Sequence, residues 1–402
     1  MKTLKQRPTW RRLTFMMPLM APRLPIAVVL ALATAGVFAQ TPAIQQPPAP
    51  QQRPPIFRGG VSVVRVDAVV TDRSGVPVTG LKEEDFEIRE GGKLQKISSF
   101  QSIMLDGGLM LDPGDQTRIS SDEVAATEAS RDDVRLFTIF LDDYHVSPES
   151  SRIVRDQLSR FVETQLGPSD IVGLMYPMTP LASIPFTRDI NKVVKVLQQF
   201  EGRRGDYRPR NAIEEGYVYK LGMGASVEEI RNEVVFSALK GLAMLMGGMK
   251  EGRQTLVLVS EGYRSGNRDR LYIDLRDVAE VASRYNTAVY PVSPLILGPS
   301  GQWMPNNSMD TLNFLAQHSG GRAIFDQTKT GAEFRERNET FGLPRSQLTL
   351  AMKQLVIDAS VFYLMGYDSA AVPDDKFHRI DVTVKRKGLE VRHREGYWAV
   401  KK

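Results

Sequence analysis

A short apolar run that ends in two adjacent carboxylates constrains the fold of this chain more than any other feature. Residues 136–141 read Leu-Phe-Thr-Ile-Phe-Leu and are followed directly by Asp142 and Asp143. The run is too short for a helix of its own and predicts a strand that is buried on both faces. A second apolar run, 254–260, ends in the same way at Glu261. Because ligand sites of open α/β sheets lie at the carboxyl ends of the strands, the two runs predict one oxygen-lined site.

Strand and helix signals alternate from residue 134 to about 330. Further strands are predicted at 171–176, 256–260, 288–292 and 322–325, and helices at 149–165, 189–200, 227–246, 275–285 and 309–318. This alternation predicts an α/β fold with a doubly wound, mostly parallel, Rossmann-like sheet and right-handed crossovers.

The segments on either side of this domain favour β-structure. Residues 61–105 hold short alternating runs separated by Gly turns, which predict a small β-rich module. A loop rich in Gly and acids, 106–133, separates the module from the main domain. In the C-terminal segment, 331–402, we expect a helix and strands packed on the main domain. Its run 362–367 is read as a further strand of the main sheet, and the later strands as a hairpin that packs there or pairs with the module.

The N-terminus has the composition of an export signal. Residues 1–39 hold six basic residues, no acid and an apolar core with small residues before Gln40, so we expect a signal peptide, with an uncleaved anchor as the alternative. The Pro/Gln-rich stretch 40–60 predicts an extended linker. Outside the leader 46 basic and 47 acidic residues nearly balance, which argues against a nucleic-acid partner. We expect a periplasmic or extracellular protein with no membrane span in the mature chain.

Several motifs together resemble a bacterial family of secreted von Willebrand factor A-related proteins. They are Val-Asp-Ala-Val-Val-Thr-Asp-Arg-Ser-Gly at 66–75, Leu-Lys-Glu-Glu-Asp-Phe at 81–86, Phe-Leu-Asp-Asp-Tyr-His-Val at 140–146, Leu-Val-Ser-Glu-Gly at 258–262, and Phe-His-Arg-Ile at 377–380 with Gly396-Tyr397. The resemblance runs from about residue 60 to the C-terminus. It implies a von Willebrand A fold, in which an Asp-x-Ser-x-Ser motif, a distant Thr and a distant Asp surround a divalent cation, usually Mg²⁺, that receives a protein ligand.

The family's metal-ion-dependent adhesion site is degenerate in this chain. If Asp142 is the first ligand, Tyr144 and Val146 occupy the two serine positions of the motif. If Asp143 is the first ligand, His145 and Ser147 occupy them. Glu261 occupies the position of the distant Asp, and the position of the distant Thr would lie within residues 202–211. The candidate metal ligands are therefore Asp142, Asp143, His145, Ser147 and Glu261.

Two interpretations of these acids remain open. Carboxylates and water could hold Mg²⁺ or Ca²⁺, while His145 would shift the preference toward Mn²⁺ or Zn²⁺. Alternatively, Asp142 and Asp143 cap the following helix and bond backbone amides without a metal.

The function expected from these features is non-enzymatic protein binding or adhesion by an exported protein. The residues expected to contact the partner, including two from a local basic patch, are Asp142, Asp143, Tyr144, Glu261, Arg204 and Tyr207. No catalytic residue is predicted, since neither a nucleophile elbow nor a phosphate loop occurs. The alternatives are a metal-dependent hydrolase that uses the acidic cluster to activate water, and a scaffold of an envelope assembly.

Overall fold

The computed structural model describes residues 62–108, 117–221, 227–250, 252–294, 307–324, 345–369, 374 and 376–399. The predicted signal peptide, 1–39, and linker, 40–60, lie outside the described residues. Among the helices that are described, none combines the length and the apolar character that a membrane crossing requires.

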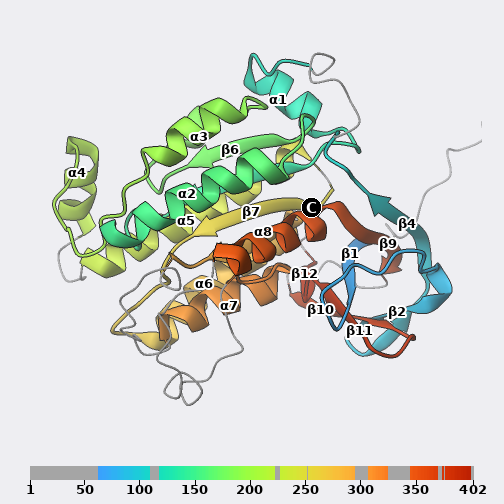
Figure 1. Ribbon diagram of the computed structural model, residues 1–402. Coiled ribbons are helices and arrows are strands. Elements are labelled where there is room, and N and C mark those ends of the chain that lie inside the picture. The colour runs from blue at the N-terminus through green and yellow to red at the C-terminus, as the bar shows by residue number, and fades with distance from the viewer. Residues whose placement is uncertain are drawn as a thin grey trace, which may run out of the picture. The chain divides into compact units, whose positions relative to one another are not determined.

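A four-stranded parallel sheet lies at the centre of the α/β part (Figure 1). Its strands are β6 (Ile171–Met175), β5 (Leu136–Leu141), β7 (Gln254–Val259) and β8 (Thr287–Val292), in that spatial order. Each residue of all four strands is buried, which explains why the runs are continuously apolar rather than alternating. The predicted α/β class with a parallel sheet is confirmed, and β5 has its predicted bounds.

Helices cover both faces of this sheet. On one face α2 (Pro148–Gln165), α3 (Ile190–Gln198) and α8 (Arg345–Ser360) share a core with the β5 side chains Phe137 and Ile139. On the other, α1 (Asp122–Ala129), α5 (Val227–Met249), α6 (Arg268–Arg284) and α7 (Asn307–Ser319) share a core with Leu136 and Phe140. Alternate β5 side chains therefore enter two separate cores, as the pleat of a strand requires.

Several elements differ from the prediction. Helices α1 and α4 (Ala212–Leu221) were not expected, and α6 begins at Arg268 rather than 275 because Asn267 caps a charged first turn that lacks apolar periodicity. The strand expected at 322–325 is reduced, where it is described, to one bridge between Ile324 and Val292.

The module is a sandwich of two antiparallel sheets built from both ends of the described chain. One sheet has the order β11-β1-β9-β4 and the other β12-β10-β2-β3. The N-terminal half supplies β1 (Ser62–Asp72), η1 (Glu83–Asp85), β2 (Phe86–Glu90), β3 (Lys93–Gln95) and β4 (Ile97–Met104). The C-terminal half supplies β9 (Val361–Ser369), β10 (Phe377–Val384), β11 (Leu389–His393) and β12 (Gly396–Trp398).

The C-terminal strands therefore pair with the module rather than with the main sheet. The expectation that 362–367 extends the main sheet is wrong, because β9 lies between β1 and β4 and pairs with both in antiparallel fashion. Its side chains Tyr363 and Met365 enter the sandwich core. An apolar run marks a buried strand but does not specify which sheet buries it.

A buried ion pair joins the module to the α/β part. Arg253, just before β7, pairs with Asp67 on β1. The same guanidinium donates to Tyr290 Oη at 3.0 Å and to the Gly320 carbonyl at 2.8 Å. Because each of these groups is buried, the ion pair fixes the module against the amino-terminal end of the parallel strands.

Candidate functional site

The loops that follow β5 and β7 meet at the carboxyl edge of the parallel sheet. The two strands are neighbours, with Leu141 opposite Val259, and the Asp142 amide donates to the Val259 carbonyl at 3.0 Å. The Glu261 amide in turn donates to the His145 carbonyl at 3.2 Å. The acids that end the two apolar runs are thus brought to one edge by adjacent parallel strands.

Asp142 is bound by two neighbouring side chains and by the His145 amide, which donates to Oδ1 at 3.3 Å. His145 Nδ1 lies 2.9 Å from both of its carboxylate oxygens, and the Ser260 hydroxyl donates to it at 2.8 Å. The His145 ring stands edge-on to Tyr263, with 5.0 Å between ring centroids. Burial, followed by the charge of Asp142, raises the pKa of Tyr263 well above its ordinary value, so this phenol stays protonated.

Asp143 is bound by Arg203 from the segment that follows α3. Arg203 Nε donates to the carboxylate at 2.8 Å, and the Arg203 amide donates to the Asp143 carbonyl at 2.8 Å. Arg203 Nη2 also donates to Glu214 on α4 at 2.6 Å, so one guanidinium joins two acids. Burial raises the pKa of Asp143, although the charge of Arg203 opposes this effect. Burial would also raise the pKa of Glu214, but the hydrogen bonds that it accepts from Arg203 and from the Arg210 amide outweigh burial, so its pKa is lowered.

Glu261 is bound by Ser147 and Arg204. The amide and the hydroxyl of Ser147 each donate to Glu261 Oε1 at 3.0 Å, and Arg204 Nη1 lies 2.5 Å from Oε2. Ser147 is also the N-cap of α2, since its hydroxyl accepts from the Ser150 amide at 3.2 Å. The metal-free alternative expected Asp142 and Asp143 to cap the helix and to bond backbone amides. Asp142 does accept from the His145 amide, but the N-cap of α2 is Ser147.

A close backbone approach brings both arginines over the acids. A Cβ at Gly202 would lie 2.3 Å from the Val146 carbonyl oxygen, so a larger residue would push the chain away. The Arg204 amide donates to that same carbonyl at 2.9 Å. Residues 202–211, which we name the arginine loop, therefore cover the carboxyl edge of the sheet.

The side chains do not fit a divalent cation as they are arranged. Asp142 faces His145 and Ser260, Asp143 faces Arg203, and Glu261 faces Ser147 and Arg204, so each carboxylate already has a positive or hydrogen-bonding partner. Within the described ranges, no three His, Asp or Glu side chains gather in a way that could hold a metal ion. Mg²⁺ requires near-octahedral oxygen contacts, which this set cannot supply without breaking the arginine pairs.

Two buried side chains that the sequence analysis did not single out complete the site. Glu214 lies on the unpredicted helix α4 and gave no signal in the sequence. Arg231 lies on α5, three and four residues before the buried side chains Val234 and Val235. A charged residue on the apolar face of this predicted helix was the signal that could have identified it.

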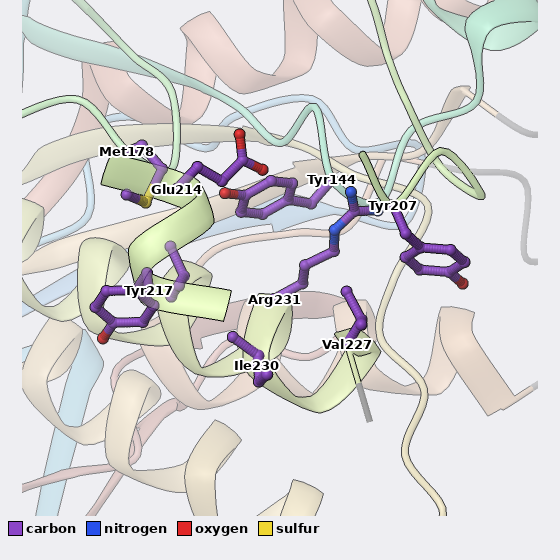
Figure 2. Close-up of a pocket in the computed structure, with 9 residues that line it drawn as sticks. Tyr144, Met178, Tyr207, Glu214, Tyr217, Val227, Ile230 and Arg231 are labelled. Carbon is purple, nitrogen blue, oxygen red and sulfur yellow. The ribbon is translucent and has the colours of Figure 1, made fainter. Parts of the chain in front are cut away.

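Aromatic side chains sandwich the second of these residues. The Arg231 guanidinium carbon lies 4.8 Å from the ring centroids of both Tyr144 and Tyr207 (Figure 2). The Arg203 guanidinium carbon lies 4.4 Å from the Tyr144 ring centroid. Tyr144 is buried, and Tyr207 is half-exposed on the arginine loop. The expected contact residues Tyr144, Arg204 and Tyr207 thus lie near the acids, but only Tyr207 is largely exposed among them.

No protein-family model and no curated protein matches this chain.

Proposed function

We propose that this chain is an exported, non-enzymatic protein-binding protein with a von Willebrand A-like domain, whose partner docks on the arginine loop and α4. The resemblance of the motifs and the composition of the leader support the class and the export. The carboxyl edge of the sheet supports the position of the binding surface. The proposal needs no metal ion.

The observation that carries the proposal is the burial of the acids beneath the arginine loop. Asp142, Asp143 and Glu261 are 0, 6 and 1% exposed, so a partner cannot reach them without moving the loop. We assign them to positioning: Asp143 through Arg203 and Glu261 through Arg204 fix the loop in one conformation, and Asp142 holds His145 beside them. A loop held by buried charge pairs loses little entropy on binding, which favours affinity.

The exposed residues above the acids have the composition of an interface. Tyr207 is 49% exposed on the loop, and Ile213 and Tyr217 are 75 and 39% exposed on α4. Ile213 and Tyr217 are four residues apart and therefore lie on one face of the helix. Arg208 and Arg210 flank them on the loop. Tyr and Arg surrounded by polar side chains are enriched where proteins bind one another.

The test is capture of envelope proteins by the tagged, exported chain with chemical cross-linking, with and without chelator. The double variant Tyr207→Ala, Ile213→Ala should lose a partner that the wild type captures. The matched control is Ile273→Ala, which removes a 49% exposed apolar side chain from α6, away from the arginine loop. Equal recovery of every partner by wild type and double variant, with folding intact, would reject this surface. Loss of capture with chelator would contradict the metal-free form.

A further inference from the structure

Arg231 is a buried cation with an unsatisfied donor. The residue is 3% exposed, its Nη2 donates to the Asp206 carbonyl, and its Nη1 is buried with no hydrogen-bond partner in the part of the chain that the structure describes. The charge of Glu228 acts on it through space, and Glu228 Oε2 is likewise buried without a hydrogen-bond partner among the described residues. An unpaired N–H on a buried charge costs stability, so a group that accepts from Nη1 would be favoured.

A small cavity lies at this guanidinium. Its walls include Tyr144, Tyr207, Glu214 and Tyr217, and its volume is about 10 Å³, roughly that of one water molecule (Figure 2). Tyr207 is half-exposed and forms one wall. A rotation of this side chain would therefore open the guanidinium to a ligand without moving the buried acids.

An apolar groove continues from the cavity along α5. It has a volume of about 300 Å³, and both share Met178, Tyr217 and Val234 as walls. The other residues that line the groove are Met175, Pro177, Thr179, Pro180, Leu181, Ser237 and Ala238. The groove can hold one or two apolar side chains next to whatever group reaches Arg231.

The surrounding charges favour an anion with a single charge. Burial, and next the nearby charge of Arg203, lower the pKa of Arg231, while the charges of Glu228 and Glu214 oppose this. Arg203 itself is neutralised by Asp143 and Glu214. A phosphate dianion at the cavity would meet the Glu214 carboxylate on the same wall, whereas a carboxylate brings half of that charge.

We propose that Arg231 receives the carboxylate of an acidic side chain in a peptide segment of the partner, while an adjacent apolar side chain of that segment fills the groove. The inference rests on the proposed function and gives the chemistry of its partner. Tyr207 acts as the cover that the carboxylate displaces. The cavity and the groove are thus occupied by a peptide with neighbouring acidic and apolar side chains, and Arg231 contacts its carboxylate directly.

The experiment measures fluorescence anisotropy of the full exported chain with pools of hexapeptides, acetylated, amidated and labelled with a neutral dye. The acidic pool carries Asp or Glu beside Leu, Phe or Met. The amide pool carries Asn or Gln in place of the acid, and the phosphoserine pool carries phosphoserine there. The C-terminal pool has no acidic side chain and, unlike the others, keeps a free C-terminal carboxylate. We expect the acidic pool to bind about tenfold or more tightly than the amide pool, as a charge-assisted hydrogen bond implies.

Variants assign the preference to the guanidinium. Arg231→Gln should abolish the difference between the acidic and amide pools, and Tyr217→Ala should weaken both pools while keeping their ratio. Arg270→Gln is the control, because Arg270 is exposed on α6, pairs with Asp274 and does not line the cavity. If Arg231→Gln does not fold, Arg231→Lys, which keeps the charge without the planar fork, should bind the acidic pool more weakly but retain part of its preference.

Several results would overturn the inference. They are equal binding of the acidic and amide pools, tighter binding of the phosphoserine pool, binding of the C-terminal pool alone, no binding of any pool, or a preference that survives Arg231→Gln. The proposed function fails separately: envelope capture that depends on Tyr207 and Ile213 without any acid preference would leave the surface in place and reject only the carboxylate contact.

Discussion

Arg204 and Glu261, 57 residues apart in the chain, form an ion pair of 2.5 Å at the carboxyl edge of the parallel sheet. Glu261 is buried and Arg204 mostly so. The sequence motifs led us to expect a metal ion opposite this acid. Here a guanidinium supplies the opposite charge from within the chain, and the same pair attaches the arginine loop to the end of β7.

We predict that Glu261→Ala lowers the free energy of unfolding by about 2 to 3 kcal/mol, because it leaves Arg204 and two Ser147 donors without their acceptor. Glu261→Gln keeps an oxygen for Ser147 and should cost about 1 kcal/mol. Urea denaturation followed by circular dichroism measures both changes. Equal losses for the two variants would contradict the separate contributions of the charge and of the acceptor.

Removal or addition of divalent cations should leave the protein unchanged. Each of Asp142, Asp143 and Glu261 already has its partner within the chain, and a ligand raises the melting temperature only if it binds the folded state. We expect no shift of the melting temperature with chelator or with millimolar Mg²⁺, Mn²⁺ or Ca²⁺, and no heat in calorimetry. Heat that disappears in Asp143→Asn would establish a metal site and contradict this prediction.

The contribution of Glu214 to stability should depend on pH. Its pKa in the folded protein is lowered below the ordinary 4.5, since Arg203 and the Arg210 amide favour the ionised form over the effect of burial. A lowered folded pKa means that the stabilisation is present above 4.5 and is lost as the pH falls through the folded pKa. The stability difference between wild type and Glu214→Gln should therefore be largest near neutral pH and shrink toward pH 3.

The control for this prediction is Glu215→Gln, the exposed neighbour on the same helix. Thermal melts of the three proteins at several pH values provide the measurement. Asp143 has a raised pKa and contributes in the opposite direction, and because it shares Arg203 with Glu214, the same comparison made in an Asp143→Asn background separates the two acids. A difference that grows as the pH falls would contradict the assignment.

The positions of the acids could be predicted from the sequence, but not their pairing with Arg203 and Arg204. Apolar runs that end in Asp142 and Glu261 indicate buried parallel strands, and neighbouring parallel strands bring their ends together. The partners Arg203 and Arg204 lie about 60 residues from these acids, and nothing local in the sequence encodes that pairing. Patterns of short period report the burial of a strand or a helix face and leave long-range charge pairs undetermined.

The same limit explains the errors in the fold. Helix α4 carries Ile213 and Tyr217 exposed, so it lacks the apolar stripe by which a helix is recognised. Strand β9 was found as an apolar run but assigned to the main sheet. Its true neighbours, β1 and β4, lie more than 250 residues earlier in the chain. Which sheet a strand joins therefore depends on long-range contacts, which a local sequence pattern does not report.

The ion pair of Arg253 and Asp67 should be the strongest single polar link between the sandwich and the α/β part. Both side chains are almost fully buried, and Arg253 also donates to Tyr290 and to the Gly320 carbonyl. Asp67→Ala leaves this guanidinium without its counter-charge, so the free energy of unfolding should fall by about 3 to 5 kcal/mol. The matched control is Glu87→Ala, which breaks an ion pair with Arg89 on the more exposed face of β2 and should cost less than about 1 kcal/mol. Denaturation followed by both circular dichroism and tyrosine fluorescence provides the measurement. A loss as small as that of the control would mean that the apolar contacts of the interface, not the buried charges, hold the module in place.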